Sequence, residues 1–457
     1  MDRRYEEQKA AMLAECEVSP EVFRGVQVRL QEFAQPFAAL LQRKEQRQHA
    51  MEYMSGLMSD LECKNVESIA YRHDQDRRAL QRFVGCAEWD HQPLIQELAR
   101  QVGQELGESD AVIVFDPSGF PKQGKKSVGV ARQWCGRLGK VDNSQVAVYM
   151  AYVSREGHAL VNTRLYLPEE WTKDRVRCRA AGIPKHIKFQ TRHAQALDML
   201  QEQAALLPHG WIGGDDEMGK NAAFRRDLHE RQEQYLLAVP GEMLMRNLEV
   251  EPPARRAAGP APKQPFQRID SWRDSLAPES WTRINVRDGE KSALEVEVAL
   301  CRVQTKLKGR VMPYEETAVV IRCLDEKGAT KYDFYFSNAS RETPAHEFAR
   351  VALAAHRVEE AIKRSKGEAG LADYEVRTWL GWHHHQALSL IATWFLVLET
   401  RRGKKMDSCA HGSADSRRDR DGVASCLPMP HPRSNRTKQN TSPTTKRRST
   451  LLSLQIA

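Results

Sequence analysis

The first part of the chain carries apolar residues at helical spacing. Phe33, Phe37, Leu40 and Leu41 recur three or four positions apart, and the segment Leu94–Leu106 repeats the pattern. We therefore expect residues 1–108 to form a helical N-terminal domain.

From Ala111 onward the pattern becomes that of strands. The β-branched run 111–115 is followed by a segment rich in Gly, Pro and Lys, 116–127, for which we expect a turn. Two more strand-like segments follow, and then helical and strand-like segments alternate. A meander followed by αβ alternation predicts a mixed α/β sheet flanked by helices, as in the ribonuclease-H-like fold. Its first part spans 109–245, with further strands at 144–154, 158–168, 210–216 and 235–240 and helices at 196–207 and 222–232.

A Pro- and Ala-rich linker, 251–267, precedes four strand-like segments separated by charged turns. We interpret residues 246–342 as a linker and a β-rich insertion that interrupts the core. Helical patterns at 345–366 and 387–398 then complete the core in a C-terminal helical part, 343–405. Residues 406–457 are rich in Ser, Thr, Pro and Arg with little periodicity, which predicts a disordered tail.

Composition excludes several classes of protein. The 457 residues are 41% hydrophobic and 28% charged, typical of a globular protein with two or three domains. The longest apolar stretch, Ala387–Leu398, is too short to span a bilayer, and the N-terminus has no apolar signal core. The nine cysteines include no CxxC pair, which argues against a zinc site or a disulfide framework. We expect a cytoplasmic protein.

The net charge of +8 does not by itself predict a nucleic-acid surface. From Arg401 onward the chain has 13 Lys and Arg against 4 Asp and Glu, so the preceding 400 residues are almost neutral. A DNA-binding surface in the body of the protein must come from local clusters of basic residues.

Three acidic residues are the candidates for chemistry. Asp116 and Asp216 come at or just after strand-like runs, and Glu359 lies in a helical segment. Carboxylates are ligands for hard divalent cations, and two such ions can activate a nucleophile and stabilise a leaving oxygen in phosphodiester chemistry. Asp215 and Glu360 are direct competitors, and a strand-end Asp is more often a turn or cap residue. Glu360 faces Lys363 and Arg364, which favours a surface ion pair.

Long segments resemble the DDE transposases of bacterial insertion sequences, in the group with a β-rich insertion between the second Asp and the Glu. The resemblance runs from about Phe33 to Lys405. Its most specific segments are Gly119–Trp171, the DDEMG motif at 215–219, the RDGEK motif at 287–291 and His356–His385.

The resemblance implies the function. It assigns Asp116, Asp216 and Glu359 as a catalytic and metal-binding triad for two Mg²⁺ or Mn²⁺ ions, and it implies cleavage at transposon ends and strand transfer into target DNA. Its implied partners are the terminal inverted repeats, target DNA and a second copy of the chain in the synaptic complex. The implied location is the bacterial cytoplasm. A disabled DNA-binding remnant and a nuclease without strand transfer remain as alternatives.

Two departures from the family pattern bear on mechanism. Elsewhere in the superfamily, Tyr and Arg stand seven and four residues before the Glu, where this chain has Ala352 and Ala355. That motif therefore does not support a hairpin intermediate on the flanking strand. The first motif reads Pro117-Ser118-Gly119-Phe120, where an acidic residue followed by Thr-Gly-Phe is expected.

Several basic residues are candidates for DNA contact. Lys366 matches the Glu-x6-Lys signature, and the resemblance places it on DNA. The loop after Asp116 is where a phosphate backbone would pass, and the N-terminal helices carry a basic run that is either a solvated face or a phosphate contact. The candidates are Lys122, Lys125, Lys126, Arg132, Arg137 and Arg357, with Arg43, Lys44 and Arg47 in the basic run.

Two other groups have competing interpretations. Trp272 and Trp281 could stack on an extruded base, although core packing is preferred. The run His383–His385 resembles a metal cluster, but adjacent helical residues point in different directions, which favours packing and capping.

The tail prompts a further hypothesis. Read one base later, permissible codons for 406–422 spell an amphipathic continuation that resembles the family's usual C-terminal region. The observed tail would then be a frameshift product, and the nucleotide sequence decides the matter.

Overall fold

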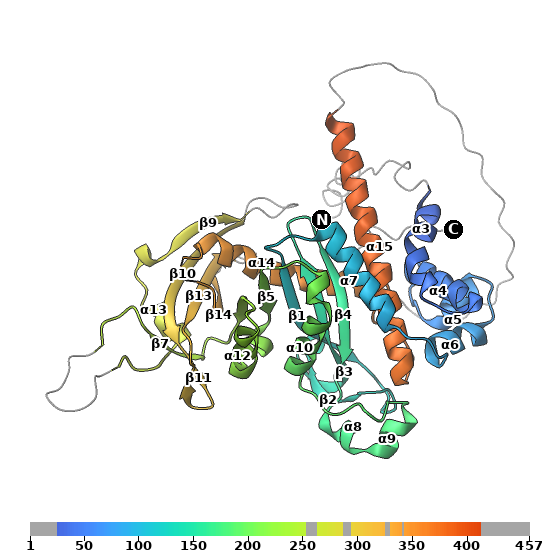
Figure 1. Cartoon of the computed structure of the whole chain (residues 1–457), viewed down its shortest axis with the longest axis horizontal. Helices are drawn as coiled ribbons and strands as arrows, with labels where there is room; N and C mark the ends of the chain where they lie inside the picture. The colour runs from blue at the N-terminus through green and yellow to red at the C-terminus, as the bar shows by residue number, and fades with distance from the viewer. Residues whose placement is uncertain (1–24, 253–262, 287–293, 325–329, 341, 413–457) are drawn as a thin grey trace, which may run out of the picture.

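The computed structural model describes residues 25–252, 263–286, 294–324, 330–340 and 342–412. Three regions lie side by side: N-terminal helices with the long C-terminal helix, a central sheet, and a β-rich region at the other end (Figure 1). The N-terminal region is helical, as expected. Its helices are α3 (Val26–Ala39), α4 (Lys44–Leu57), α5 (Val66–Arg72), α6 (Arg77–Gly85) and α7 (Gln92–Leu106).

The central sheet has the strand order β4-β3-β1-β5-β6. The pairs β4–β3 and β3–β1 are antiparallel, whereas β1–β5 and β5–β6 are parallel. This mixed arrangement is the ribonuclease-H-like topology, so the predicted fold class is confirmed. The strands are β1 (Val112–Pro121), β2 (Ala131–Cys135), β3 (Lys140–Val153), β4 (His158–Leu165), β5 (Trp211–Gly214) and β6 (Tyr235–Ala238).

The turn expected at 116–127 begins later than predicted. β1 continues through Pro121 because β3 extends back to Lys140 and pairs with β1 from Val153 to Ser144. Asp116 therefore lies within a strand, opposite Tyr149. The sequence-based prediction did not include β2, which pairs with the start of β3. The short 3₁₀ helix η1 (Gly136–Leu138) connects these two strands.

Helices cover both faces of the central sheet. In the view of Figure 1, α10 lies in front of the sheet and α14 behind it. The N-terminal helices share one continuous hydrophobic cluster with the sheet and with α14 and α15. The remaining helices are α8 (Glu169–Lys173), α9 (Arg175–Ala180), α10 (Arg192–Gln203), η2 (Ala204–Leu206), α11 (Asp216–Gly219), α12 (Ala222–Glu230), α14 (Ala345–Glu368) and α15 (Trp379–Gly412).

The last helix is longer than predicted at both ends. The apolar stretch expected at 387–398 is the middle of α15, which begins at Trp379 and ends at Gly412. The predicted boundary at 405 therefore falls inside a helix, and residues 413–457 of the predicted tail lie outside the described residues. Among the described helices, none is long and apolar enough to cross a membrane.

The β-rich insertion extends the central sheet through the antiparallel pair β6–β14. Alternate residues of β13 face two clusters: Val319 and Ile321 join the main core, whereas Ala318 and Val320 pack with Trp272. The predicted boundary at 245/246 falls inside β7, which pairs with β10. The elements are β7 (Leu244–Asn247), β8 (Gln267–Arg268), α13 (Ile269–Asp274), η3 (Pro278–Ser280), β9 (Thr282–Val286), β10 (Leu294–Gln304), β11 (Lys306–Leu307), β12 (Arg310–Val311), β13 (Glu316–Leu324) and β14 (Thr330–Ser337).

A buried ion pair joins the insertion to the core. Arg225 of α12 and Glu316 of β13 are fully buried, and the Arg225 Nε atom lies 2.7 Å from Glu316 Oε1. The hydroxyl of Tyr235 donates to the same carboxylate at 2.6 Å, and the hydroxyl of Thr305 donates to its second oxygen. Arg225 also donates to the carbonyl oxygen of Gly219. The Arg225 guanidinium and the Glu316 carboxylate each have several hydrogen-bond partners. The network therefore holds the insertion and the core in one relative orientation.

We predict that Glu316→Gln destabilises the protein by about 3–5 kcal/mol, because it leaves the Arg225 charge buried without its counter-ion. The free energy of unfolding is measured by urea denaturation. The control is Arg226→Ala, which removes the exposed pair with Asp227 on the same helix and should change stability little. Equal losses in the two variants would contradict the assigned role of the buried pair.

Candidate active site

Asp116, Glu359 and Lys366 meet at one cavity of about 490 Å³. Asp116 comes from β1, in the middle of the sheet, and the other two come from α14, which crosses the sheet beside β1. Seven residues separate Glu359 from Lys366, which is two helical turns, so both side chains lie on the α14 face that lines the cavity. The packing of α14 thus brings the Glu359 carboxylate and the Lys366 ammonium close to β1.

Asp116 lies in a strongly acidic environment. The pKa of its carboxyl is raised to about 8, first by burial and then by the negative charges of Asp215 and Glu359, while the Lys366 ammonium opposes the rise. Burial also raises the pKa of Asp215 to about 7, against the hydrogen bond from the Met218 amide. The two carboxyls therefore share a region in which additional negative charge is unfavourable.

The geometry favours Asp215 over Asp216 as the partner of Asp116. The parallel register of β1 and β5 pairs Phe115 with Gly214, so Asp116 and Asp215 each occupy the position after the last pair. Asp216 is exposed at the first residue of α11. The neighbouring Glu217 is engaged by Arg192, whose Nη1 atom lies 2.5 Å from Glu217 Oε1.

Lys366 is held over β1 by two contacts. Its Nζ atom donates to Ser118 Oγ at 2.8 Å and lies 4.6 Å from the centroid of the Phe120 ring. Burial lowers the pKa of the Lys366 ammonium, and the Arg137 guanidinium lowers it further, while Asp116 raises it. The Ser118 that replaces the expected Thr therefore positions the signature lysine.

The hairpin formed by β2, η1 and β3 approaches β1 at Gly119. A Cβ atom at this position would stand 3.0 Å from the Sγ atom of Cys135 and 3.3 Å from its Cα atom. Glycine leaves room for this close approach of the hairpin, in which Arg137 of η1 lines the cavity together with Asp116. Gly119 thus has a packing role that explains its place in the motif.

The described residues contain no preformed metal cage. Within the described ranges, no three or more His, Cys, Asp or Glu side chains stand close enough together to hold an ion as they are placed. The oxygen donors at the cavity are nevertheless of the type that hard cations prefer. Their mutual repulsion is the electrostatic condition that a divalent cation relieves.

Apart from Lys366 and Arg137, the predicted DNA-contact residues are not among those that line this cavity. Lys125 and Lys126 are exposed in the loop after β1, and Arg132 is exposed on β2. Lys122 turns inward instead: its Nζ atom lies 3.6 Å from the Tyr374 ring centroid and donates to the Tyr374 carbonyl oxygen. Arg357 is half-buried in α14, two residues before Glu359.

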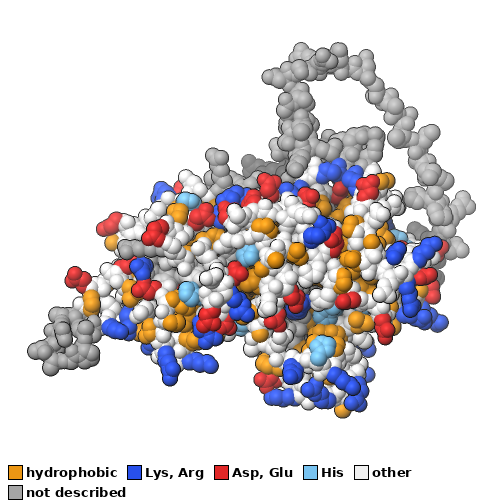
Figure 2. All heavy atoms as spheres, viewed as in Figure 1, with side chains coloured by type: hydrophobic (Ala, Val, Ile, Leu, Met, Phe, Trp, Pro, Cys, Tyr) orange, Lys and Arg blue, Asp and Glu red, His pale blue; other side chains and the backbone are white. Residues whose placement is uncertain are grey.

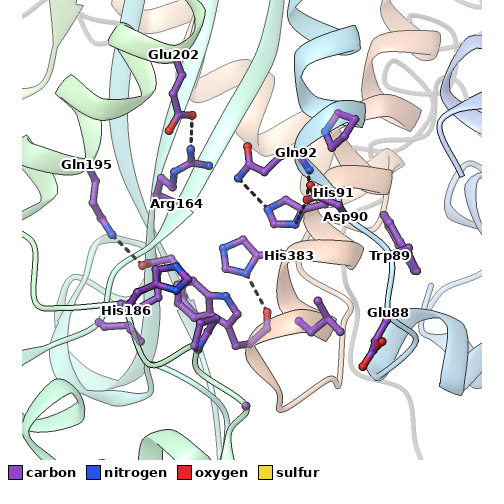
Figure 3. Close-up of a pocket in the computed structure, with 18 of the residues that line it drawn as sticks. Glu88, Trp89, Asp90, His91, Gln92, Arg164, His186, Gln195, Glu202 and His383 are labelled. Atoms are coloured by element: carbon purple, nitrogen blue, oxygen red, sulfur yellow. Dashed lines mark hydrogen bonds and ion pairs between the residues drawn. The ribbon is translucent and has the colours of Figure 1, made fainter.

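A larger cavity, of about 1060 Å³, lies between the N-terminal helices, α15 and the β4–α10 region (Figure 3). Its labelled side chains include His91 and His383, whose ring centroids are 4.7 Å apart. Burial lowers the pKa of His383 to about 3, so the ring is neutral. Three carboxylates line this cavity, Glu88, Asp90 and Glu202, and Glu202 is paired with Arg164.

The three consecutive histidines are core residues, as the packing interpretation predicts. His383 donates from Nδ1 to the Trp379 carbonyl oxygen at 2.9 Å, His384 stacks on Trp89 at 3.6 Å between centroids, and His385 Nδ1 lies 2.8 Å from the Tyr53 hydroxyl. Trp272 is likewise 5% exposed in the core of the insertion, and the ring of Trp281 carries the Arg322 guanidinium at 4.1 Å. Among the described residues, six cysteines form no disulfide: Cys63, Cys86, Cys135, Cys178, Cys301 and Cys323.

A signal for Asp215 is present in the sequence. The runs 112–115 and 211–214 are both four residues long, and an Asp follows each of them directly, which places Asp116 and Asp215 level in a parallel pair. No comparable pattern announces Ser118 or Arg137, because their roles depend on where α14 and the hairpin pack.

We predict that Asp116→Asn raises thermal stability at pH 8 by on the order of a few degrees, and that the gain disappears near pH 4. The pKa of the Asp116 carboxyl is about 8 in the folded protein, above that of an aspartate in the unfolded chain. The stability that the protonated carboxyl contributes is therefore lost as the pH rises from the unfolded pKa through the folded pKa of about 8. The melting temperature is measured at several pH values. Asp142→Asn is the contrasting control, because its lowered pKa reflects an ion pair with Lys140, and it should give no gain at pH 8.

We also predict that Gly119→Ala destabilises the protein by about 1–3 kcal/mol, because the added methyl group collides with Cys135. The control is Gly136→Ala on the same hairpin, where a Cβ atom meets nothing within 4 Å. Urea denaturation measures both, and an equal effect of the two variants would contradict the close approach.

Comparison with known proteins identifies the family of this chain. The sequence model of the DDE superfamily endonucleases matches residues 36–293. A probable transposase for insertion sequence element IS701, from Microchaete diplosiphon, is 34% identical over 94 residues, 20% of this chain; the match spans only 25% of that relative's length. Among solved structures, the NurA nuclease from Sulfolobus solfataricus aligns over 70% of this chain and 92% of its own. Its identity is 10% and its TM-score 0.24, too low to support any inference. On the family match, which covers more than half of its residues, the chain belongs to the DDE superfamily of endonucleases.

Proposed function

We propose that this protein is a DNA transposase that cleaves the ends of an insertion element and joins them to target DNA. The observation that carries the proposal is the convergence of Asp116, Glu359 and Lys366 at one cavity of a ribonuclease-H-like core, with the Asp215 charge close enough to raise the pKa of Asp116. The family match and the similarity to a probable transposase support it.

Endonucleases of this family generally use divalent metal ions, and the residues present fit such ions in donor chemistry and charge. Asp116, Asp215 and Glu359 would hold two Mg²⁺ or Mn²⁺ ions, after their side chains turn toward one another. When bound, the ions activate the attacking hydroxyl and stabilise the leaving oxygen of the phosphodiester.

The protein groups have separate roles in this proposal. Asp116 and Asp215, on adjacent parallel strands, define the floor of the site, and Glu359 closes it from α14. Lys366 releases Ser118 and donates to a phosphate oxygen of the bound strand. Arg137 faces the same cavity and fixes the approach of the DNA backbone.

The partners follow from the proposed reaction. The terminal inverted repeats and the target DNA would lie over the exposed basic residues near the cavity, including Lys125, Lys126 and Arg132. Two ends must be brought together for joining, so we infer a homodimer in the synaptic complex, acting in the cytoplasm on chromosomal DNA.

A cleavage and joining assay tests the proposal. The full-length protein is incubated with Mg²⁺ and DNA that carries the terminal repeats flanking its gene. Asp116→Ala, Asp215→Asn and Glu359→Gln should each reduce cleavage by about 100-fold or more, because even residues that only support metal ligands cost 10- to 100-fold. Asp216→Asn is the matched control and should retain most activity.

The assay separates the alternatives. Loss of cleavage in Asp216→Asn with retention in Asp215→Asn would restore the sequence-based preference for Asp216. Cleavage without joining would indicate a nuclease, and DNA binding without cleavage by the unaltered chain would indicate a remnant. As an independent readout, Mg²⁺ should raise the melting temperature of the unaltered protein but not that of Asp116→Ala.

A further inference from the structure

We propose that the exposed ring of Trp134 is a stacking platform for an unpaired DNA base next to the active-site cavity. The inference rests on the proposed function and adds to it a requirement: the DNA must open beside the cleaved bond.

Trp134 is exceptional among the tryptophans of this chain. All nine lie in the described residues, and Trp134 alone is exposed, at 58% of its surface. Aromatic rings bury large apolar areas in cores and interfaces, so leaving one in water forgoes substantial stabilisation. A ring exposed in this way is suited to contact with a partner.

The surroundings of Trp134 form an open platform. Trp134 and Arg132 are two residues apart on β2 and therefore share one face of the strand. Val141 of β3, which is 50% exposed, stands directly opposite Trp134 in the ladder. Leu138, at the turn of the hairpin, is 41% exposed. Trp134, Arg132 and Val141 therefore share one exposed face of the hairpin.

The charges around this platform favour a nucleic acid. The hairpin carries three basic residues, Arg132, Arg137 and Lys140, against one acidic residue, Asp142, which is paired with Lys140. Basic and aromatic side chains in alternation are typical of surfaces that bind single strands, where bases stack and the backbone is neutralised. A second copy of this chain would have to present acidic residues to the same hairpin.

The basic surface continues from the hairpin onto α9. Arg177 donates to the carbonyl oxygens of Lys125 and Val130, which lie in the segment that leads into β2. Arg175 and Arg179 are exposed on the same helix. Figure 2 shows Lys and Arg side chains gathered at the end of the molecule where Figure 1 places α8 and α9.

The platform lies beside the reacting centre. Arg137 lines the cavity that contains Asp116 and Glu359, and it follows Trp134 by three residues. The close approach at Gly119 holds this hairpin against β1. A strand whose phosphate reaches Asp116 therefore passes Trp134 within a few nucleotides. Because both faces of a base are covered inside a duplex, stacking on Trp134 requires an unpaired base.

Binding measurements on the full-length protein test the inference. The probe is a single-stranded oligonucleotide of about 20 nucleotides, longer than a typical single-strand site, with 2-aminopurine at one position. Binding is followed by anisotropy and by 2-aminopurine fluorescence in EDTA, so that no cleavage occurs. The same sequence as a full duplex is measured in parallel, together with the oligomeric state.

We expect Trp134→Ala to weaken single-strand binding by on the order of tenfold and to abolish the change in 2-aminopurine fluorescence, with little effect on the duplex. Trp134→Phe should retain most of the affinity, whereas Trp134→Leu should not. Tyr71→Ala, which removes another exposed aromatic ring (65% exposed) on α5, is the matched control and should bind normally.

Other outcomes overturn the inference. Stacking would be excluded if Trp134→Ala bound the single strand as tightly as the unaltered protein. It would also be excluded if Trp134→Leu kept the full single-strand affinity. A loss of self-association without a loss of DNA binding would assign the hairpin to a contact between copies. If the unaltered protein binds neither the single strand nor the duplex, both this inference and the proposed function fail. The loss of stacking alone, or the assignment of the hairpin to a contact between copies, leaves the proposed function intact.

Discussion

The repulsion among carboxylates at the centre of the sheet is the constraint on which the rest of this structure depends. Asp116 and Asp215 stand level on adjacent parallel strands, and Glu359 adds a third negative charge from α14. Burial raises the pKa of the first two above the usual range of an aspartate. A protein retains such an arrangement at the expense of stability, and a divalent cation is the natural means of relieving it.

The surrounding elements act as supports for this cluster. The glycine at position 119 lets the β2–β3 hairpin approach β1, and Ser118 holds Lys366 beside the acids. At the far end, the Arg225–Glu316 pair joins the insertion to the core. A buried pair of this kind is weak evidence for stability, but it fixes one relative orientation of two regions. We regard that orientation as its contribution here.

The net charge of the chain does not show where its basic residues lie. The net charge of +8 comes from the C-terminal segment, and the body of the chain is almost neutral. Basic residues in the body are concentrated near the cavity, on the β2–β3 hairpin and on α9. Local concentration of this kind directs a polyanion to one surface, whereas an evenly basic protein would bind it without direction.

Periodicity by itself determined the element order, the mixed α/β class and the place of the insertion, because burial of one face imposes a regular spacing on each element. It also placed Asp116 at a strand and Glu359 and Lys366 on one helix, since these are local properties, whereas their assignment as site residues rested on the family resemblance. It could not show that β1 continues past Asp116, because that depends on hydrogen bonds from the distant end of β3. The alignment of Asp215 with Asp116, the contact of Ser118 with Lys366 and the placement of Arg137 at the cavity were decided by tertiary structure alone. Each joins segments far apart in the chain, and only the packed sheet and helices fix their distances.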